Sequence, residues 1–287
     1  MNFLVYKIKM QTKIIDGKKI RDEILVEVKK GVASLPFQPI FCDVLVGEDL
    51  VSKQYVDMKN RMARTVGIGF KDASFPITIT TEALIKEIKN LNRVPKICGI
   101  IVQLPLPSSL DMQAILDTID SRLDVDCLGA VASDKFYKNE RSLGFPTALA
   151  CLAILDSIRL DLKDKKIVVL GQGELVGKPV AALLRFRGFF PEVITRATKE
   201  KETIIKQADV IISGMGNGKF ITGQMIKDGV VIIDAGTSES NSAIVGDVDL
   251  ESVKDIASFV SPVPGGVGPV TVAMLFKNIL TVAKNIS

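Results

Sequence analysis

A glycine-rich turn between an apolar strand and an apolar helix is the feature that most restricts how this chain can fold. Residues 167–170 are a short β-branched and apolar run, typical of a strand buried on both faces. Gly171, Gly173 and Gly177 follow, and the residues after them are apolar at helical spacing. Gly171 suits the tight turn, and Gly173 lets backbone N–H groups approach a phosphate at the positive end of the helix. The turn predicts a nucleotide-binding βα unit; the alternative is an ordinary turn with incidental glycines.

The segments after this turn alternate between strand and helix. Strands are expected at 192–196, 210–213, 230–234 and 259–261, and helices at 199–207 and 222–227. This order is most simply a parallel, doubly wound sheet. The spacing Gly-x-Gly-x-x-x-Gly is one residue longer than the usual dinucleotide fingerprint, but its place between strand and helix favours nucleotide binding.

The first half of the chain also alternates. Strands are expected at 14–15, 40–46, 68–70 and 97–102, and helices at 18–32, 53–65, 81–91 and 110–119. A helix at 147–158 leads into the second half, and a last helix follows Pro269. We therefore expect an α/β protein with two domains, at residues 1–150 and 151–268.

Composition excludes several classes of protein. The chain has 287 residues, enough for two domains, and 47% are hydrophobic, which supports a packed core. A net charge of +4, spread along the chain, is too weak for a nucleic-acid-binding surface. No apolar run is expected to span a membrane, and residues 1–10 lack the features of a signal peptide. We expect a cytoplasmic protein without nucleic-acid or membrane partners.

The chain contains no histidine and four dispersed cysteines. The cysteines form no C-x-x-C pair, so neither a zinc site nor a disulfide framework is indicated, and we expect no metal. Without histidine, proton transfer near neutral pH must use Lys, Asp, Glu, Tyr, Cys or water.

Polar residues beside two expected strands are candidates for a site. Ser52 predicts the N-cap of the helix at 53–65, on which Tyr55 and Lys59 share one face. Gln103 closes an apolar strand and precedes two prolines. All three are therefore expected at the carboxyl edge of a sheet, where α/β proteins bind ligands. The alternatives are a surface tyrosine, a solvated lysine and a strand-end glutamine in water.

A charged segment at 120–143 lacks a clear period and contains Asp124 and Asp126. Two acids in such a segment are either part of a solvated loop or contacts to a ligand.

Six stretches carry further information. They are Ser-x-x-Tyr-Val-x-x-Lys at 52–59, Val-Gln-Leu-Pro-Leu-Pro at 102–107, Asp-Val-Asp at 124–126, Val-Gly-Lys-Pro at 176–179, Gly-Asp-Val at 246–248 and Pro-Val-Pro-Gly-Gly-Val-Gly-Pro-Val-Thr at 262–271. In this order they make the chain resemble the bifunctional methylenetetrahydrofolate dehydrogenase/methenyltetrahydrofolate cyclohydrolase family. The second and the last are very specific to it, and the six cover nearly the whole chain.

The resemblance implies that folate binds between an N-terminal catalytic domain and a Rossmann-type domain, with the helix at 269–287 packed back on the first. It implies that Lys59 is the catalytic lysine, that Gln103 hydrogen-bonds it and that Tyr55 stacks on the folate ring. Asp126 would hold the pterin amine and ring nitrogen. The other implied substrate contacts are Val102, Leu104, Pro264, Gly265 and Gly266. A homodimer in one-carbon metabolism, serving purine biosynthesis, is also implied.

The same resemblance implies an NADP site. Its residues would be Gly171, Gln172, Gly173, Val176, Gly177, Thr195, Arg196, Thr198 and Thr237. The family usually has Gly-Arg-Ser where this chain has Gly-Gln-Gly at 171–173, so a cation and a hydroxyl are missing. Many members have His-Ser or His-Arg where this chain has Thr195-Arg196. Arg196 favours the 2′-phosphate of NADP; the alternative is a solvated strand-end arginine and an NAD-dependent enzyme.

Two further departures lie near the folate side. The family's Asp-Val-Asp-Gly ends in Cys127 here, which affects the loop that carries Asp126. Its Pro-Cys-Thr-Pro is Phe-Pro-Thr-Ala at 145–148.

The implied chemistry suits a chain without histidine. A hydride leaves the one-carbon bridge of methylenetetrahydrofolate for the nicotinamide, and water then adds to the methenyl cation and opens it to formyltetrahydrofolate. An uncharged Lys59 amine is the natural base for that water. Gln103 orients the amine without stabilising the ammonium as a carboxylate would. The alternatives are a binding module without turnover, and a generic amino-acid or shikimate dehydrogenase that leaves the first domain's motifs unexplained.

Overall fold

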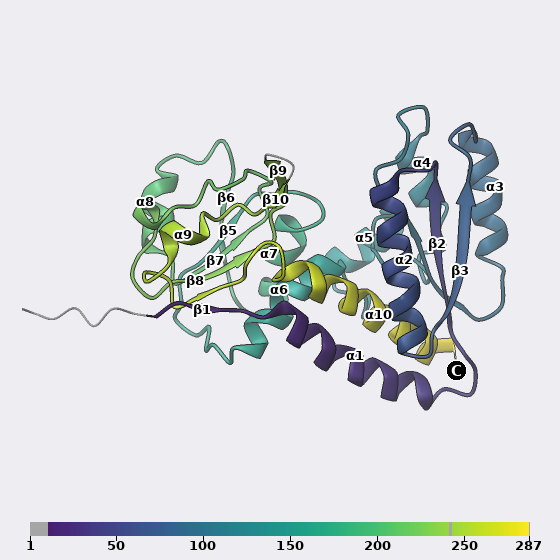
Figure 1. Ribbon diagram of the computed structural model, residues 1–287, viewed down its shortest axis with the longest axis horizontal. Helices are drawn as coiled ribbons and strands as arrows, with labels where there is room; N and C mark the ends of the chain where they lie inside the picture. The colour runs from purple at the N-terminus through teal and green to yellow at the C-terminus, as the bar shows by residue number, and fades with distance from the viewer. Residues whose placement is uncertain (1–10, 241–242, 287) are drawn as a thin grey trace, which may run out of the picture. The chain divides into compact units, whose positions relative to one another are not determined.

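The computed structural model describes residues 11–240 and 243–286 (Figure 1). Its contacts divide the chain into two compact units. Unit 1 contains the chain up to Ile20 together with Thr147–Val270, and unit 2 contains Arg21–Pro146 and Thr271–Ser287. Residues 1–10, for which the sequence predicts no signal peptide, lie outside the described residues.

Unit 1 is built on a six-stranded sheet in the order β1-β11-β8-β7-β5-β6, in which every neighbouring pair is parallel. The strands are β1 (Lys13–Ile14), β5 (Ile167–Leu170), β6 (Glu192–Ile194), β7 (Val210–Ser213), β8 (Val231–Asp234) and β11 (Phe259–Val260). The helical segments are α6 (Pro146–Ser157), α7 (Gly177–Phe186), α8 (Lys201–Gln207), α9 (Leu250–Val253) and the 3₁₀ turn η1 (Gly223–Met225). β5, β7 and β8 are buried along their whole length, as strands with both faces covered are. The parallel sheet is confirmed.

β1 places the start of the described chain in unit 1. Its two residues pair in parallel with β11, and Thr12 Oγ1 donates a hydrogen bond to the Ala257 carbonyl at 2.7 Å. A pairing between segments this far apart leaves no local trace in the sequence. Sequence analysis therefore groups the strand at 14–15 with the first domain, whereas the structure places it in the sheet of unit 1.

Two segments of unit 1 differ from expectation. The helix expected at 222–227 is only the η1 turn, where Gly223 packs so closely that a Cβ would lie 2.1 Å from the Ser252 carbonyl oxygen. β9 (Ser238–Ser240) and β10 (Ala243–Val245) form an antiparallel hairpin. Strands of three residues are too short to show an alternating pattern.

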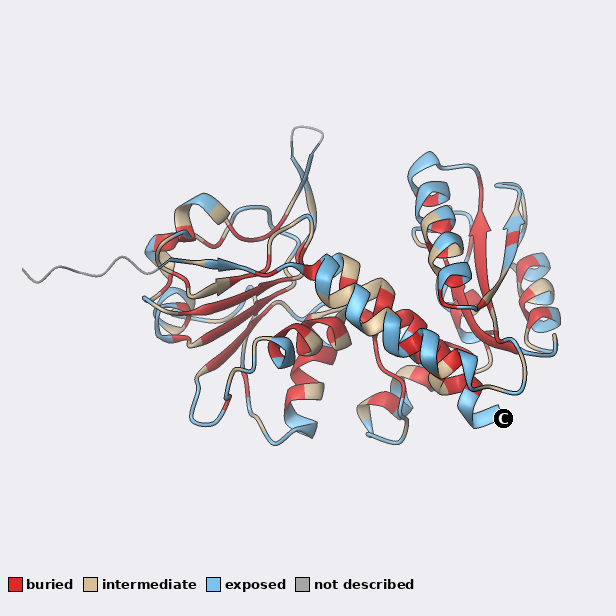
Figure 2. Cartoon of the chain, turned by 60° about the horizontal axis from the view of Figure 1, so that its bottom comes forward, coloured by how far each residue is buried: buried red, intermediate tan, exposed pale blue. Residues whose placement is uncertain are grey.

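Unit 2 holds a three-stranded parallel sheet with β2 (Ile40–Val46) between β3 (Gly69–Phe75) and β4 (Ile97–Val102). Its helices are α2 (Leu50–Thr65), α3 (Thr81–Leu91), α4 (Met112–Asp117) and α5 (Ala130–Tyr137), together with α1 (Gly17–Ala33) and α10 (Val267–Ile286), each of which has its first four residues in unit 1. Figure 2 shows the buried residues concentrated in the strands and on the inward faces of the helices. β2 is buried from Phe41 onward, and the acid Asp43 at its centre is buried with it.

α10 packs in the core of unit 2. The Phe276 ring meets Phe41 of β2 edge to face at 5.8 Å. Asn278 donates hydrogen bonds to the carbonyls of Val125 and Gly144, both at 2.8 Å. By length and composition α10 is the one helix of the described residues that could cross a membrane, which corrects the expectation that no apolar run is long enough. Its apolar window is 61% buried, as in a core helix.

Candidate active site

α2 carries two of the expected site residues one turn apart. The helix begins at Leu50, because the Asp49 carboxylate accepts a hydrogen bond from the Ser52 backbone N–H at 2.7 Å and caps it. The prediction that Ser52 is the N-cap is therefore wrong by three residues. Tyr55 is 47% exposed, whereas Lys59 is only 6% exposed. This burial excludes a solvated lysine at position 59.

Gln103 follows β4 and meets Lys59. Its backbone N–H donates to the Val44 carbonyl of β2 at 2.8 Å, which fixes the residue at the carboxyl end of the sheet. Its Oε1 accepts a hydrogen bond from Lys59 Nζ at 2.7 Å, and its Nε2 donates to the Leu104 carbonyl at 3.3 Å. Two candidates from different elements are thereby neighbours at one sheet edge.

Asp43 is a second partner of Lys59 that sequence analysis missed. Its Oδ2 lies 2.7 Å from Lys59 Nζ, and its Oδ1 has no hydrogen-bond partner among the described residues. Burial raises the pKa of Asp43, and the charge of Lys59 opposes that rise. The sequence predicts only the Gln103 amide beside Lys59. In the structure, a carboxylate contacts the same amine. The signal that could have found Asp43 is a single acid inside an apolar strand.

The loop between α4 and α5 places its two acids in different surroundings. Asp124 is buried, and its Oδ2 accepts a hydrogen bond from the Gly129 N–H at 2.8 Å, which holds the loop. Asp126 is partly buried. Burial raises the pKa of Asp126 to about 7; the charge of nearby Lys59 opposes the rise, and Asp124 and Asp43 add to it. Asp126 is therefore an acid near Lys59 whose charge changes around neutral pH.

Cys127 stands where the family pattern has glycine. Its φ of +62° lies in the left-handed region that glycine adopts freely, and its side chain is fully buried. The loop thus keeps a glycine-like backbone, which costs about 1–2 kcal/mol in a residue with a Cβ. A side chain at this φ therefore stores strain beside Asp126.

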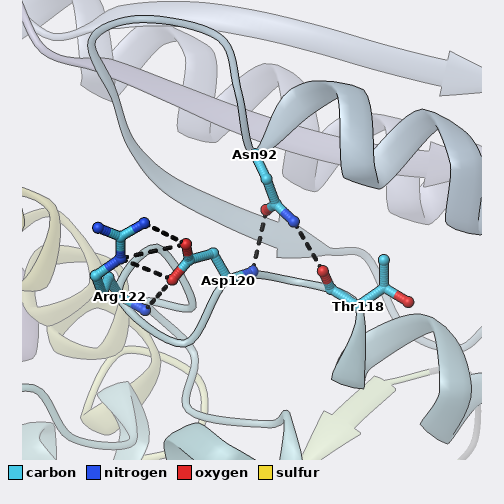
Figure 3. Close-up of polar contacts among 4 residues, drawn as sticks. All are labelled: Asn92, Thr118, Asp120 and Arg122. Carbon is cyan, nitrogen blue, oxygen red and sulfur yellow. Dashed lines mark hydrogen bonds and ion pairs between the residues drawn. The ribbon is translucent and has the colours of Figure 1, made fainter.

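A polar cluster supports the same loop (Figure 3). Asn92 accepts a hydrogen bond from the Asp120 N–H at 3.0 Å and donates one to the Thr118 carbonyl at 2.8 Å. Arg122 Nη2 lies 2.6 Å from Asp120 Oδ2, and this hydrogen bond holds the pKa of Asp120 below its usual value. A cavity of about 310 Å³ lies beside them. Because these polar groups bond to one another, the cluster braces the segment that carries Asp126.

The glycine-rich turn of unit 1 has the form that a phosphate site needs. Gly171 has a φ of +96°, and a Cβ on Gly177 would lie 2.1 Å from the Gly171 carbonyl oxygen. No atom lies within 4 Å of a Cβ built on Gly173. α7 begins at Gly177 without a side-chain cap, which leaves its positive end able to receive an anion; the Lys178 N–H donates to the Gly173 carbonyl at 3.2 Å. Close packing therefore requires Gly171 and Gly177, whereas Gly173 leaves open space.

The turn after β6 carries the candidates for cofactor choice. β6 ends at Ile194, two residues earlier than expected. The Thr195 N–H donates to Thr198 Oγ1 at 2.9 Å, and the Thr198 N–H donates to the Thr195 carbonyl at 3.2 Å. Arg196, between them, is exposed. The turn is ordered by its threonines and presents a guanidinium at the carboxyl end of a sheet strand.

Two buried carboxylates, to which the sequence assigns no role, hold the loops after β7 and β8. Asp247 accepts hydrogen bonds from Ser213 Oγ, at 2.6 Å, and from the backbone N–H groups of residues 215 and 217. Asp234 accepts from three backbone N–H groups, and burial raises its pKa to about 6. Thr237 is exposed on the second of these loops.

The remaining candidates are divided between the units. In unit 2, Val102 is buried in β4, so its side chain belongs to the core, while Leu104 is partly exposed. In unit 1, Pro264, Gly265 and Gly266 form the loop before α10, and the Gly265 carbonyl accepts a hydrogen bond from the Gly17 N–H at 3.0 Å.

Comparison with protein families decides the identity of both units. Residues 15–126 match the tetrahydrofolate dehydrogenase/cyclohydrolase catalytic domain, and residues 146–287 match the NAD(P)-binding domain of the same family. The chain belongs to the tetrahydrofolate dehydrogenase/cyclohydrolase family. A generic amino-acid or shikimate dehydrogenase is set aside, because the match includes the first half of the chain.

Individual relatives agree with the family assignment. The bifunctional protein FolD of Nautilia profundicola is 38% identical over 276 residues, covering 95% of this chain and 97% of the relative. That of Moorella thermoacetica is 39% identical over 279 residues, covering 96% and 100%. The structure of the bifunctional FolD enzyme from Campylobacter jejuni has a TM-score of 0.91 at 33% identity, covering 96% and 100%. The Trypanosoma brucei FolD, complexed with NADP cofactor and inhibitor, has a TM-score of 0.89 at 33% identity, covering 96% and 98%.

Proposed function

We propose that this chain oxidises methylenetetrahydrofolate to methenyltetrahydrofolate with NADP and then hydrolyses the product to formyltetrahydrofolate. Membership of the family over both units supports the pair of reactions. The observation that carries the proposal is the hydrogen bond from buried Lys59 Nζ to Gln103 Oε1. We assign the folate-binding catalytic domain to unit 2 and the nucleotide-binding domain to unit 1, in place of the expected division at residues 150 and 268.

The first step requires placement more than acid–base chemistry. NADP supplies the hydride acceptor. Tyr55, which is half exposed on α2, stacks on the folate ring, and Leu104 adds apolar contact. Asp126 accepts hydrogen bonds from the pterin amine and ring N–H, for which a carboxylate offers two acceptor oxygens. These contacts hold the one-carbon bridge while a hydride leaves it as a methenyl cation forms.

The second step requires a base. Water adds to the methenyl carbon as one of its protons passes to the Lys59 amine. The carbon–nitrogen bond of the ring then breaks, the released nitrogen takes up a proton, and the hydroxyl of the adduct loses its proton to leave the formyl group. Gln103 accepts an N–H of Lys59 and so directs the amine. In a chain without histidine, a lysine held in this way supplies the proton acceptor.

The nucleotide turn supports NADP as the cofactor. The uncapped start of α7 faces the pyrophosphate, with Gly171, Gln172, Gly173, Val176 and Gly177 around it. Arg196 pairs with the 2′-phosphate, and Thr195, Thr198 and Thr237 line the remainder of the site. An NAD-dependent enzyme is the second candidate, favoured by Gln172 and Gly173 where the family carries a cation and a hydroxyl.

We propose further that the protein is a cytoplasmic homodimer. β3 pairs only with β2 among the described strands, so one of its edges is open to a second chain. Its role would lie in one-carbon metabolism and purine biosynthesis.

Turnover by the purified protein tests the proposal. Methylenetetrahydrofolate should reduce NADP, and methenyltetrahydrofolate should lose its absorbance faster than in buffer. Binding of both ligands without either product would instead establish a non-catalytic binding module.

A further inference from the structure

Lys59 lies between an uncharged partner and a charged one. Its Nζ is 2.7 Å from Gln103 Oε1 and 2.7 Å from Asp43 Oδ2. The Asp43 side chain is fully buried, and its second oxygen has no hydrogen-bond partner among the described residues. Asp43 thus has one close charged contact, the amine proposed as the base.

We propose that Asp43 is a positioning residue that holds a proton on Lys59 and thereby sets the pH range of the hydrolysis step. This inference rests on the proposed role of Lys59.

The four bonding directions of Lys59 Nζ explain how Asp43 affects the base. Two of its directions point to Asp43 and Gln103, and one is bonded to Cε. The fourth carries an N–H in the ammonium form and a lone pair in the amine form. Only the lone pair can take a proton from water. Because a carboxylate at this distance favours the ammonium, Asp43 restrains Lys59 from acting as a base at low pH.

The other charged groups near this pair are few. Asp72 of β3 is the register partner of Asp43, is exposed and accepts a hydrogen bond from Ser74 Oγ. Asp126, in the loop between α4 and α5, interacts electrostatically with both Lys59 and Asp43, and Asp124 of the same loop lies near Asp126. Within β2, burial raises the pKa of Cys42 to about 12, so that thiol is neutral, and Lys71 lies near it on β3. Of these groups, Asp43 alone is in ion-pair contact with Lys59.

Folding does not explain an acid at this position. Replacing a buried ion pair by apolar side chains of similar volume is often neutral or stabilising. β2 is otherwise apolar around residue 43, so a valine would continue its pattern. A carboxylate that the strand does not need, and that touches one amine, is better explained by its effect on that amine.

Profiles of rate against pH test the proposal. The hydrolysis rate of methenyltetrahydrofolate, corrected for buffer, and the NADP reduction rate are measured from pH 5 to 9 for wild type, Asp43→Asn and Asp43→Val. We expect the acid limb of the hydrolysis kcat to move to lower pH by about one to three units in both variants. The dehydrogenase profile should keep its position. Asp72→Asn is the matched control and should leave both profiles in place.

Two results would overturn the proposal. One is an unmoved acid limb in Asp43→Val; the other is a uniform loss of both activities at every pH, which a structural role alone would cause. Circular dichroism shows which variants fold. If Asp43→Asn does not fold, the profile of Asp43→Val tests the proposal. Lys59→Met in the same assay separates the role of Lys59 from the role of Asp43. If Lys59→Met retains hydrolysis, Lys59 is not the base. If Lys59→Met loses hydrolysis while the acid limb of Asp43→Val stays in place, only the role of Asp43 is rejected.

Discussion

Lys59 Nζ donates a hydrogen bond to Gln103 Oε1 across 2.7 Å, joining α2 to the end of β4. An amide oxygen accepts from an amine and from an ammonium alike. The contact therefore fixes where the nitrogen lies without fixing its charge. The charge depends on Asp43 on its other side and on whatever cation the substrate presents.

Gly177→Ala should weaken unit 1 and its cofactor site. The new Cβ would lie 2.1 Å from the Gly171 carbonyl oxygen, which the backbone can relieve only by moving. Overpacking of this kind costs about 1–3 kcal/mol, so we expect a lower midpoint in urea unfolding and weaker NADP binding in a fluorescence titration. Gly173→Ala is the control for the unfolding midpoint, because no atom lies within 4 Å of its Cβ. Equal midpoints for the two variants would show that the close packing is absent.

Arg196→Ala should change the preference between cofactors. A charge-assisted hydrogen bond to a phosphate contributes about 1.5–3 kcal/mol, so kcat/KM for NADP should fall by about tenfold or more. The value for NAD, which lacks the 2′-phosphate, should change by less than about twofold. Lys199→Ala removes a nearby exposed cation and serves as the control. Parallel losses with both cofactors would mean that Arg196 does not read the 2′-phosphate.

Asp126→Asn should alter both stability and substrate binding. The pKa of Asp126 is raised from 3.8 to about 7 in the folded chain, so the folded chain binds more protons between these pH values. The stability that the folded chain gains from holding the Asp126 proton is present at pH 4. It is lost as the pH rises through 7 and the buried carboxyl ionises. We expect the variant to exceed wild type in thermal midpoint at pH 8 and to lose that advantage at pH 4. The folate KM should rise by about tenfold or more.

The control for Asp126 is Asp57→Asn, which removes an exposed acid of α2. Its midpoint should follow that of wild type at every pH. A constant difference between Asp126→Asn and wild type from pH 4 to 8 would contradict the raised pKa.

Local patterns predict much of this fold. The run at 167–170 and the glycines after it indicate a strand and a helix start, and both are present. Long-range pairing is not predictable in this way, because β1 joins β11 across nearly the whole chain. The cap of α2 is missed for a different reason: Asp49 and Ser52 are both good N-caps, and only the hydrogen bond in the structure distinguishes them.

In the site, too, local patterns predict some residues, whereas others depend on contacts between distant parts of the chain. Tyr55 and Lys59 can be paired from helical spacing, and Gln103 from its place at a strand end. Asp43 cannot be assigned a role from spacing, since its role depends on its contact with Lys59 of α2. Cys127 is visible in sequence as a departure from a pattern, but only the structure shows that its φ of +62° lies in the left-handed region that glycine favours.

The central claim is that Lys59 is the proton acceptor for hydrolysis, and one substitution tests it most directly. Lys59→Met removes the amine at similar length, and Lys59→Met with Asp43→Val also avoids an unpaired buried carboxylate. Retained NADP reduction would show that the variant is folded. The account predicts that hydrolysis of methenyltetrahydrofolate falls by about a hundredfold or more, to the rate in buffer. A folded variant that hydrolyses the substrate at the wild-type rate would contradict it.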